Sequence, residues 1–288
     1  MKYTHVILGG SGHIGSVLSA KLIEQGKQVL IVGHDPGKAV EWTAKGATYS
    51  VADILDTKKL RALFSQGERL FILNPPAPPD RDSDAVERQQ VRSILQAVED
   101  LPLKKIVAAS TYGAQQGEDI YDLGTLYDLE QGLQKLKVPL AVLRSAYYMS
   151  NFDQILPTVK ARHELTTVFP KDFKLPMVAP ADIGHYAAAL LQDQRNGLFF
   201  IEGPEPYSNQ DAADILQQII NEEVQVKTIP EPDWVDFMMK GGFSERSARS
   251  FAGMAKLTLE KSAAASDPER GPTSLRNYLT AAYKTIDK

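Results

Sequence analysis

The chain has 288 residues, 43% of them hydrophobic and 24% charged, which is ordinary for a globular protein with one large core. Its net charge of −4 gives no reason to expect a nucleic acid or an anionic membrane as a partner. The absence of cysteine excludes disulfides and thiolate catalysis, and the five histidines show no metal-binding spacing, so no metal site is predicted. With no long apolar run and a first strand close to the N-terminus, we expect a cytoplasmic protein without a signal peptide or membrane span.

The most informative segment is the glycine-rich turn that follows the first predicted strand, residues 4–8. Glycines at positions 9, 12 and 15 form the pattern G-x-x-G-x-x-G. Gly9 permits a tight turn, Gly12 lets the backbone approach a pyrophosphate, and Gly15 lets the next helix pack closely. A helical stripe and a second apolar strand follow, as in a β-α-β dinucleotide-binding unit. The alternative is a glycine turn that binds phosphate only, or nothing.

The first half of the chain alternates between apolar strands and amphipathic helices. This alternation predicts a parallel sheet covered on both faces, an α/β fold of the Rossmann-like doubly wound class. Strands are predicted at residues 4–8, 28–32, 47–50, 69–73, 104–109 and 139–143.

Beyond Arg144 the pattern is less regular and predicts a smaller α+β C-terminal lobe. We divide the chain into an NAD(P)-binding Rossmann domain, residues 1–150, and a substrate or lid lobe, residues 151–288, interleaved with the sheet domain. In this lobe we predict helices at 182–191 and 209–220, strands at 197–201 and 224–229, a long helix capped by Ser244 and a last helix opened by Pro272. Ligands bind beyond the carboxyl ends of the strands in such sheets, so the lobe would roof that crevice.

Cofactor choice is expected to depend on the end of the second strand. NAD-binding proteins usually place an acid there for the ribose 2′-hydroxyl, and here that position is Gly33. His34 and Lys38 can both face a 2′-phosphate, with Ser11 as a hydroxyl donor, so NADP(H) is favoured. NAD(H) is the alternative if Asp35 binds the ribose, although Asp35 could equally cap a short helix.

Six segments share their order and spacing with a known family. They are VILGGSGHIG (6–15), VGHDPGKA (32–39), ADILD (52–56), LNPP (73–76), AASTYGA (108–114) and LRSAYYMSNF (143–152). They resemble the NmrA-like family, atypical relatives of the short-chain dehydrogenases/reductases. That family includes NAD(P)H:quinone oxidoreductases and non-enzymatic NADP-sensing regulators, and the resemblance covers roughly residues 1–230.

The resemblance implies a role for each motif. The cofactor-binding residues would be Gly9, Ser11, Gly12, His13, Ile14 and Gly15 at the pyrophosphate, His34 and Lys38 at the 2′-phosphate, Asp53 and Ile54 at the adenine, and Asn74, Pro75 and Pro76 at the nicotinamide ribose. The catalytic residues, which position nicotinamide or substrate, would be Ser110, Tyr112, Tyr148 and Asn151, with Thr111, Tyr147, Met149 and Phe152 beside them. His34 departs from the arginine of many members, and an imidazole is neutral much of the time near pH 7.

The proton-donating dyad of the wider superfamily is missing. None of the eleven tyrosines is followed by lysine four residues later, and by the resemblance Asp122 and Leu126 occupy the positions of the Tyr-x-x-x-Lys dyad. Alcohol–ketone interconversion moves a proton with the hydride, whereas an electron-poor quinone accepts a hydride readily and water can protonate the product. An aromatic slot for such an acceptor could come from Tyr147, Tyr148, Phe152, Trp234, Phe237 and Phe243; core packing is the alternative, favoured for Trp234 and Phe237.

These patterns predict an oxidoreductase that passes a hydride from NADP(H) to a quinone-like or other small electron-poor acceptor. The alternative is a non-catalytic NADP(H)-sensing regulator with a protein partner, and the missing dyad disfavours a sugar-nucleotide epimerase or dehydratase. A homodimer is left open. Two polar features are interpreted as structural: Arg144 as an internal ion-pair partner, and the charged run 79–92 as a solvated helix face.

Overall fold

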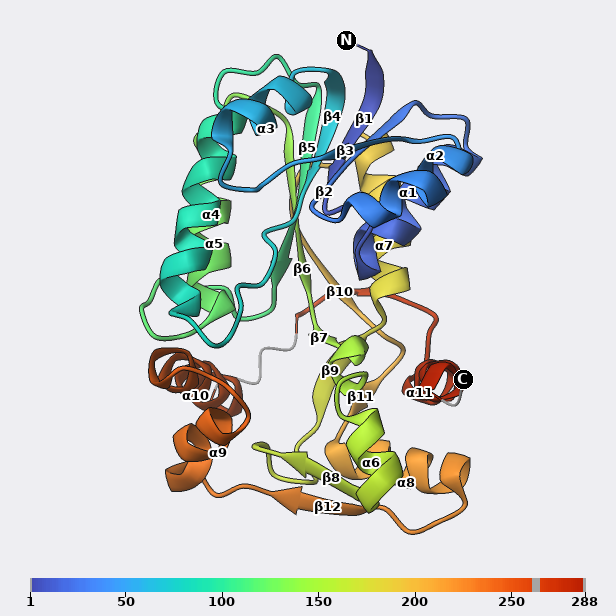
Figure 1. The fold of residues 1–288 in the computed structure, drawn as a ribbon, viewed down its shortest axis with the longest axis vertical. Coiled ribbons are helices and arrows are strands. Elements are labelled where there is room, and N and C mark those ends of the chain that lie inside the picture. Colours follow the sequence, from blue (N-terminus) through green and yellow to red (C-terminus); the bar gives the residue numbers. More distant parts are fainter. Residues whose placement is uncertain (1, 261–264, 287–288) are drawn as a thin grey trace.

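A parallel eight-stranded sheet forms the centre of the computed structural model, which describes residues 2–260 and 265–286 (Figure 1). Its order is β13-β10-β6-β5-β4-β1-β2-β3, and the neighbouring strands pair in parallel. This order confirms the Rossmann-like doubly wound class. The strands are β1 (Tyr3–Leu8), β2 (Val29–Gly33), β3 (Thr48–Val51), β4 (Gly67–Ile72), β5 (Lys105–Thr111), β6 (Leu140–Ser145), β10 (Gly197–Glu202) and β13 (Glu269–Arg270).

Helices cover both faces of this sheet, which is why its central strands are largely apolar rather than alternating. Val6 and Ile7 are adjacent and both fully buried, one in each of the two cores that flank the sheet. One core contains α3, α4 and α5, and the other contains α1, α2 and α7. The bounds are α1 (His13–Glu24), α2 (Ala39–Ala44), α3 (Thr57–Phe64), α4 (Ser83–Val98), α5 (Asp122–Gln134) and α7 (Pro180–Gln192).

The C-terminal half builds a smaller lobe but also returns to the main sheet, to which it contributes α7, β10 and β13. The lobe has its own hydrophobic core, in which Phe152 and Trp234 are buried, so these two aromatic rings serve packing. Its sheets are β11-β9-β7 and β12-β8. Its elements are β7 (Tyr147–Tyr148), α6 (Leu156–Arg162), β8 (Glu164–Thr167), β9 (Leu175–Val178), β11 (Pro206–Tyr207), α8 (Asn209–Ile220), β12 (Gln225–Thr228), α9 (Trp234–Lys240), α10 (Glu245–Glu260) and α11 (Leu275–Ile286), with short 3-10 helices η2 (Met149–Phe152) and η3 (Glu231–Asp233).

The two C-terminal helices begin at serines. Ser244 accepts a hydrogen bond of 3.2 Å from the backbone N–H three residues later, which confirms the predicted cap of α10. The last helix was expected to open at Pro272, but this was wrong, because α11 begins only after Ser274. The segment before it is held by another element: the N–H and hydroxyl of Thr273 donate to the Asp182 carboxylate at 3.0 and 2.9 Å.

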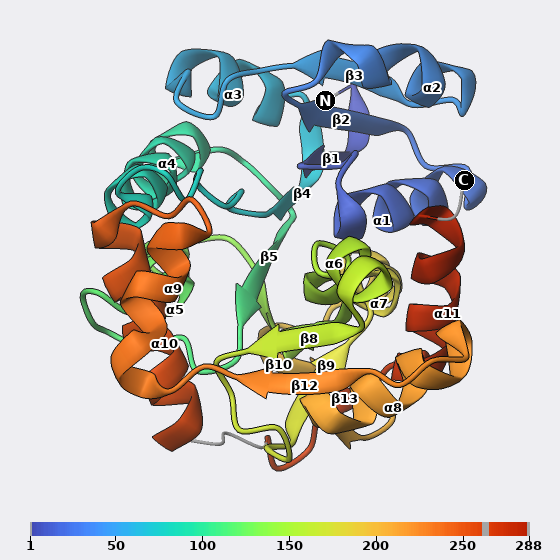
Figure 2. The same cartoon turned by 60° about the horizontal axis from the view of Figure 1, so that its bottom comes forward.

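The interpretation of residues 79–92 as a solvated helix face holds for the exposed Asp80, Arg81 and Arg92 but is wrong for two acids. Asp84 and Glu87 are only 8% and 4% exposed. Asp84 is covered by α10, which lies against α4 (Figures 1 and 2) and whose Ser250 hydroxyl donates to Asp84 Oδ1 at 2.6 Å, whereas Glu87 accepts from the Ala77 N–H and from the Thr125 hydroxyl of α5. Two carboxylates of α4, Asp84 and Glu87, therefore face the inside of the protein.

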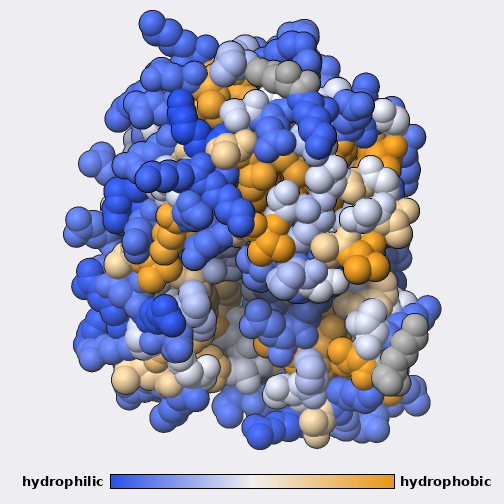
Figure 3. Space-filling model, turned by 45° about the horizontal axis from the view of Figure 1, so that its top comes forward, coloured by the Kyte–Doolittle hydropathy of each residue, from blue (hydrophilic) through white to orange (hydrophobic). Residues whose placement is uncertain are grey.

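The surface is mixed in polarity. The face drawn in Figure 3 is largely hydrophilic, with hydrophobic areas between the charged side chains. Within residues 2–260 and 265–286, no helix is both long and apolar enough to cross a bilayer.

Candidate active site

The carboxyl ends of the parallel strands lie at one edge of the sheet, and that edge faces the smaller lobe (Figure 1). The sequence motifs follow these ends in turn. They are residues 9–15 after β1, 33–38 after β2, 52–56 after β3, 73–76 after β4, 110–114 at the end of β5 and 145–152 at the end of β6.

The glycine turn after β1 has the geometry of a phosphate cradle. Gly9 adopts a φ of +72°, which favours glycine. A Cβ on Gly15 would overlap the Gly9 carbonyl oxygen, whereas a Cβ on Gly12 would meet only that oxygen, at 3.5 Å. Helix α1 then begins at His13 with no side-chain cap, so its first-turn N–H groups are available to an anion.

At the end of β2, where NAD-binding proteins usually have an acidic residue, the space beside Gly33 is occupied by a tyrosine of the next strand, β3. A Cβ on Gly33 would overlap the Tyr49 hydroxyl, so only glycine fits beside this ring. The Tyr49 hydroxyl donates to the Asp35 carbonyl at 2.9 Å and lies 3.4 Å from Ser11 Oγ. A phenol donates hydrogen bonds and is uncharged at neutral pH, so this position does not repel a 2′-phosphate as a carboxylate would.

Asp35 serves as a helix cap in this structure. Its Oδ1 accepts from the Gly37 N–H at 2.8 Å at the start of the 3-10 helix η1 (Pro36–Lys38). This was one of the two roles left open for Asp35. The side chains of His34 and Lys38 are exposed beside it, and both can donate hydrogen bonds.

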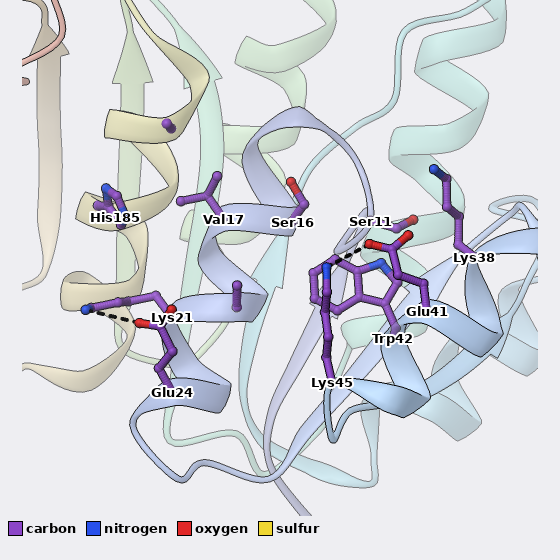
Figure 4. Close-up of a pocket in the computed structure, with 12 residues that line it drawn as sticks. Ser11, Ser16, Val17, Lys21, Glu24, Lys38, Glu41, Trp42, Lys45 and His185 are labelled. Carbon is purple, nitrogen blue, oxygen red and sulfur yellow. Dashed lines mark hydrogen bonds and ion pairs between the residues drawn. The ribbon is translucent and has the colours of Figure 1, made fainter.

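A cavity of about 590 Å³ opens between α1, α2 and α7 (Figure 4). Ser11 and Lys38 line it together, which places two of the three candidate 2′-phosphate ligands on one cavity; His34 does not line it. Lys45, on the same wall, is paired with Glu41 at 2.7 Å. The Lys38 ammonium forms no hydrogen bond or ion pair with any described residue and is available to an anion. None of the candidate substrate residues lines this cavity.

Asn74, directly after β4, has an unpaired amide. The residue is 8% exposed, and neither Nδ2 nor Oδ1 has a hydrogen-bond partner within the described chain. A buried polar group without a partner costs about 1–3 kcal/mol. An amide buried at the carboxyl edge of the sheet is therefore suited to a ligand group that enters there.

Asp122 begins α5 near this point and has an unusual environment. Its Oδ1 is buried and has no partner among the described residues. Burial, together with the nearby Glu87, raises the pKa of the Asp122 carboxyl to about 7. Burial and the Asp122 charge raise the pKa of Tyr148 to about 12, which places that phenol in the same electrostatic neighbourhood.

The other predicted catalytic residues are engaged elsewhere. Ser110 is 1% exposed and its hydroxyl donates to Glu130, which also pairs with Arg144 at 2.9 and 2.7 Å. Arg144 is thus the internal ion-pair partner that was expected. The Tyr112 hydroxyl donates to Glu202 at 2.9 Å, and burial and this carboxylate raise the Tyr112 pKa far above its ordinary value.

The remaining candidate residues lie at the rim of the candidate site, along the carboxyl edge of the sheet. Asn151 is exposed and its side chain hydrogen-bonds Tyr147, the neighbour of Tyr148. Asp53 is exposed and accepts from the Leu55 N–H at 2.9 Å. The other rim residues differ in burial: Ile14 is buried beneath the glycine turn, Ile54, Pro75 and Thr111 are half-buried, and Pro76 is exposed.

Sequence reasoning missed Tyr49 and underrated Asp122. The signal for Tyr49 was a glycine at a strand end beside a large aromatic residue in the adjacent strand, but the register β2–β3 is needed to see it. Asp122 was recognised only as the residue in place of a missing tyrosine. Its environment depends on α4, whose acids were expected to be solvated.

The fold and the site define a dinucleotide-binding protein of the Rossmann class that lacks the Tyr-x-x-x-Lys dyad. A family model described as the NmrA-like family matches residues 1–287, so the chain belongs to that family, and the resemblance seen in the sequence is confirmed.

Two characterised relatives are similar in sequence. The chain is 20% identical to an NAD(P)H azoreductase of Xenophilus azovorans over 227 residues, 78% of this chain and 76% of that protein. It is 29% identical to cinnamoyl-CoA reductase 1 of Oryza sativa subsp. japonica over 115 residues, 38% of this chain. This second match spans only 34% of the rice protein.

Two solved structures share the fold over nearly their whole length. The triphenylmethane reductase of Citrobacter sp., complexed with NADP(H), has a TM-score of 0.81 at 17% identity, and the match covers 97% of this chain and all of that one. An NADPH-dependent quinone oxidoreductase of Escherichia coli, complexed with NADPH, has a TM-score of 0.75 at 17% identity, covering 99% of this chain and all of that one.

Proposed function

We propose that this chain is an NADPH-dependent reductase whose acceptor is a flat, conjugated, electron-poor small molecule such as a quinone or an azo compound. The observation that carries the proposal is the end of β2, where the uncharged Tyr49 hydroxyl occupies the place of a ribose acid and the Lys38 ammonium stands unpaired beside it. The relatives named for a quinone, an azo compound and a triphenylmethane dye all act on conjugated acceptors, which supports this substrate class.

The residues at the sheet edge fit this cofactor. The first turn of α1 would bind the pyrophosphate, while Ser11 and Lys38 would bind the 2′-phosphate beside the Tyr49 hydroxyl, whose proton is donated to the Asp35 carbonyl. The unpaired amide of Asn74 would orient the nicotinamide end. When bound, the reduced nicotinamide supplies a hydride, and the protein contributes mainly position and the exclusion of water.

Turnover tests the proposal. With NADPH and 1,4-benzoquinone we expect loss of the absorbance of the reduced nicotinamide, and no reduction of an aliphatic ketone. Changing Tyr112, Tyr121 or Tyr127 to Phe should lower kcat/KM far less than the roughly 10²–10⁴-fold typical of a lost general acid. Tyr148→Ala and Asn151→Ala should instead raise KM for the quinone, because both would position its ring.

Two outcomes would contradict this proposal. Efficient ketone reduction that disappears on a single Tyr→Phe change would show that a phenol donates a proton. Tight NADPH binding without oxidation by any acceptor would favour the sensing regulator instead.

Cofactor preference gives a separate prediction for Lys38. Lys38→Ala should weaken NADPH binding about tenfold or more and leave NADH binding nearly unchanged, because a charge-assisted bond to the 2′-phosphate is lost. Lys45→Ala is the matched control, since that lysine lines the same cavity but pairs with Glu41. Fluorescence titration measures both. Equal or tighter NADH binding by the wild type would refute this preference.

A further inference from the structure

The reductase proposed above needs a proton as well as a hydride when its acceptor becomes a strongly basic anion. Reduction of an azo bond adds a hydride with its electron pair to one nitrogen and a proton to the other. The reduced cofactor loses the hydride, and the chain or the solvent must supply the proton. The lysine-activated tyrosine that supplies it in dyad enzymes is missing here.

We propose that Asp122 is the proton donor of this protein, delivering a proton from Oδ1 to the acceptor at the carboxyl edge of the sheet. The proposal rests on the proposed function and concerns a carboxyl at the first position of α5, the helix that carries the dyad in related enzymes. Oδ1 of Asp122 is buried and has no partner within residues 2–260 and 265–286. The carboxylate left after transfer regains its proton from water.

The hydrogen bonds of α4 decide which neighbouring acid holds the proton. Burial raises the pKa of Glu87 too, but two donors oppose that rise. Glu87 accepts from the Ala77 N–H at 3.1 Å and from the Thr125 hydroxyl at 2.8 Å, and both bonds stabilise its negative charge. Asp122 Oδ1 has no hydrogen-bond partner among the described residues, and the two backbone N–H groups that lower the Asp122 pKa, its own and that of Leu123, are outweighed by burial and by the Glu87 charge. The pair therefore keeps its charge on Glu87 and its proton on Asp122.

The other charged or titratable groups around Asp122 act in the same direction or are already paired. Asp84 of α4 also raises the Asp122 pKa. Tyr121 and Tyr148 have pKa values raised to about 12, mainly by burial, so they remain protonated and are weak acids. Arg88 of α4 is engaged by Asp128 and the Gly117 carbonyl.

A second observation points to a ligand at this place. Asn74 is 8% exposed, and both atoms of its amide lack a partner among the described residues. The loop that carries Asn74 contacts Glu87, the acid next to Asp122, because the N–H of Ala77, three residues later, donates to Glu87. The unpaired carboxyl oxygen and the unpaired amide are thus both linked to Glu87, at the carboxyl edge of the sheet where the acceptor and nicotinamide are proposed to meet. A pKa near 7 suits proton donation at neutral pH.

The first measurement needs no cofactor. In ligand-free protein labelled with ¹³C at aspartate carboxyls, the signal that disappears in Asp122→Asn should titrate near pH 7 in the wild type. A raised folded pKa stabilises the fold only at low pH, and that contribution is lost as pH rises through about 7. Asp122→Asn should therefore unfold at a higher temperature than the wild type above pH 7, a gain that disappears below about pH 4.

The second measurement is the pH profile of kcat/KM with NADPH and a water-soluble monoazo dye. Wild-type kcat/KM should fall as pH rises through 7, and this fall is the alkaline limb of the profile. Asp122→Asn should lower it about 10²-fold or more at pH 6 and remove that alkaline limb. Glu87→Gln removes the neighbouring charge and should move the limb to lower pH. Glu118→Gln, an exposed acid in the preceding loop, is the matched control and should change neither.

The outcomes separate the two proposals. Wild-type turnover with an unchanged profile in Asp122→Asn would overturn the role of Asp122 and leave the reductase in place. If Asp122→Asn does not fold, an unmoved limb in Glu87→Gln overturns it equally. A wild type that oxidises NADPH with neither the azo dye nor 1,4-benzoquinone overturns the proposed function itself, and the proton donor with it.

Discussion

Replacing Gly12 by valine is expected to abolish NADPH binding while the protein stays folded. A Cβ at this position would meet only the Gly9 carbonyl oxygen, at 3.5 Å, so the fold has room for a side chain. The same side chain would stand where a pyrophosphate approaches the turn. We expect the Kd for NADPH to rise at least about 100-fold, a loss of about 2.7 kcal/mol.

Gly15→Ala is the control for this turn, because it should show the opposite behaviour. Its Cβ would overlap the Gly9 carbonyl and lie 2.7 Å from the Gly10 Cα, so α1 must move away from the turn. We expect a loss of about 1–3 kcal/mol or more in the free energy of unfolding. Fluorescence titration and thermal unfolding of both variants check the pair. A folded Gly12→Val with wild-type affinity would remove this turn from the cofactor site.

Glu130→Ala is expected to destabilise the protein even more than Gly15→Ala. Glu130 is 3% exposed in its side chain and holds Arg144 in two hydrogen bonds while accepting from Ser110. Its removal would leave the half-buried arginine and the buried hydroxyl without their acceptor. Breaking a buried pair from one side costs about 3–5 kcal/mol, to be measured by urea unfolding.

An exposed ion pair provides the comparison for Glu130. Arg249 and Glu245 form a 2.7 Å pair on α10 with side chains 62% and 61% exposed. Glu245→Ala should leave stability within the error of the measurement, because solvent screens such pairs. If both variants lose the same stability, the loss comes from truncation of a carboxylate in general rather than from the buried network.

The order of strands and helices in the sheet domain and the glycine turn of the candidate cofactor site could be predicted from the sequence, because both depend on local patterns. Apolar runs separated by amphipathic helices specify strands covered on two faces. The G-x-x-G-x-x-G spacing specifies a turn at Gly9 and the close approach at Gly15, and both are present in the structure. The missing dyad and the absence of an acid at Gly33 are likewise properties of single positions.

Only the tertiary structure decided the environment of the polar groups. Asp84 and Glu87 belong to a charged run and are both buried: Asp84 contacts Ser250 of α10, 166 positions away, and Glu87 contacts Thr125 of α5. The pKa of Asp122 is raised by its own burial and by the Glu87 charge, and the Tyr49 hydroxyl reaches Gly33 although the β2–β3 register pairs Tyr49 with Ile31. Such properties depend on contacts between distant segments, whose partners local sequence periodicity does not encode.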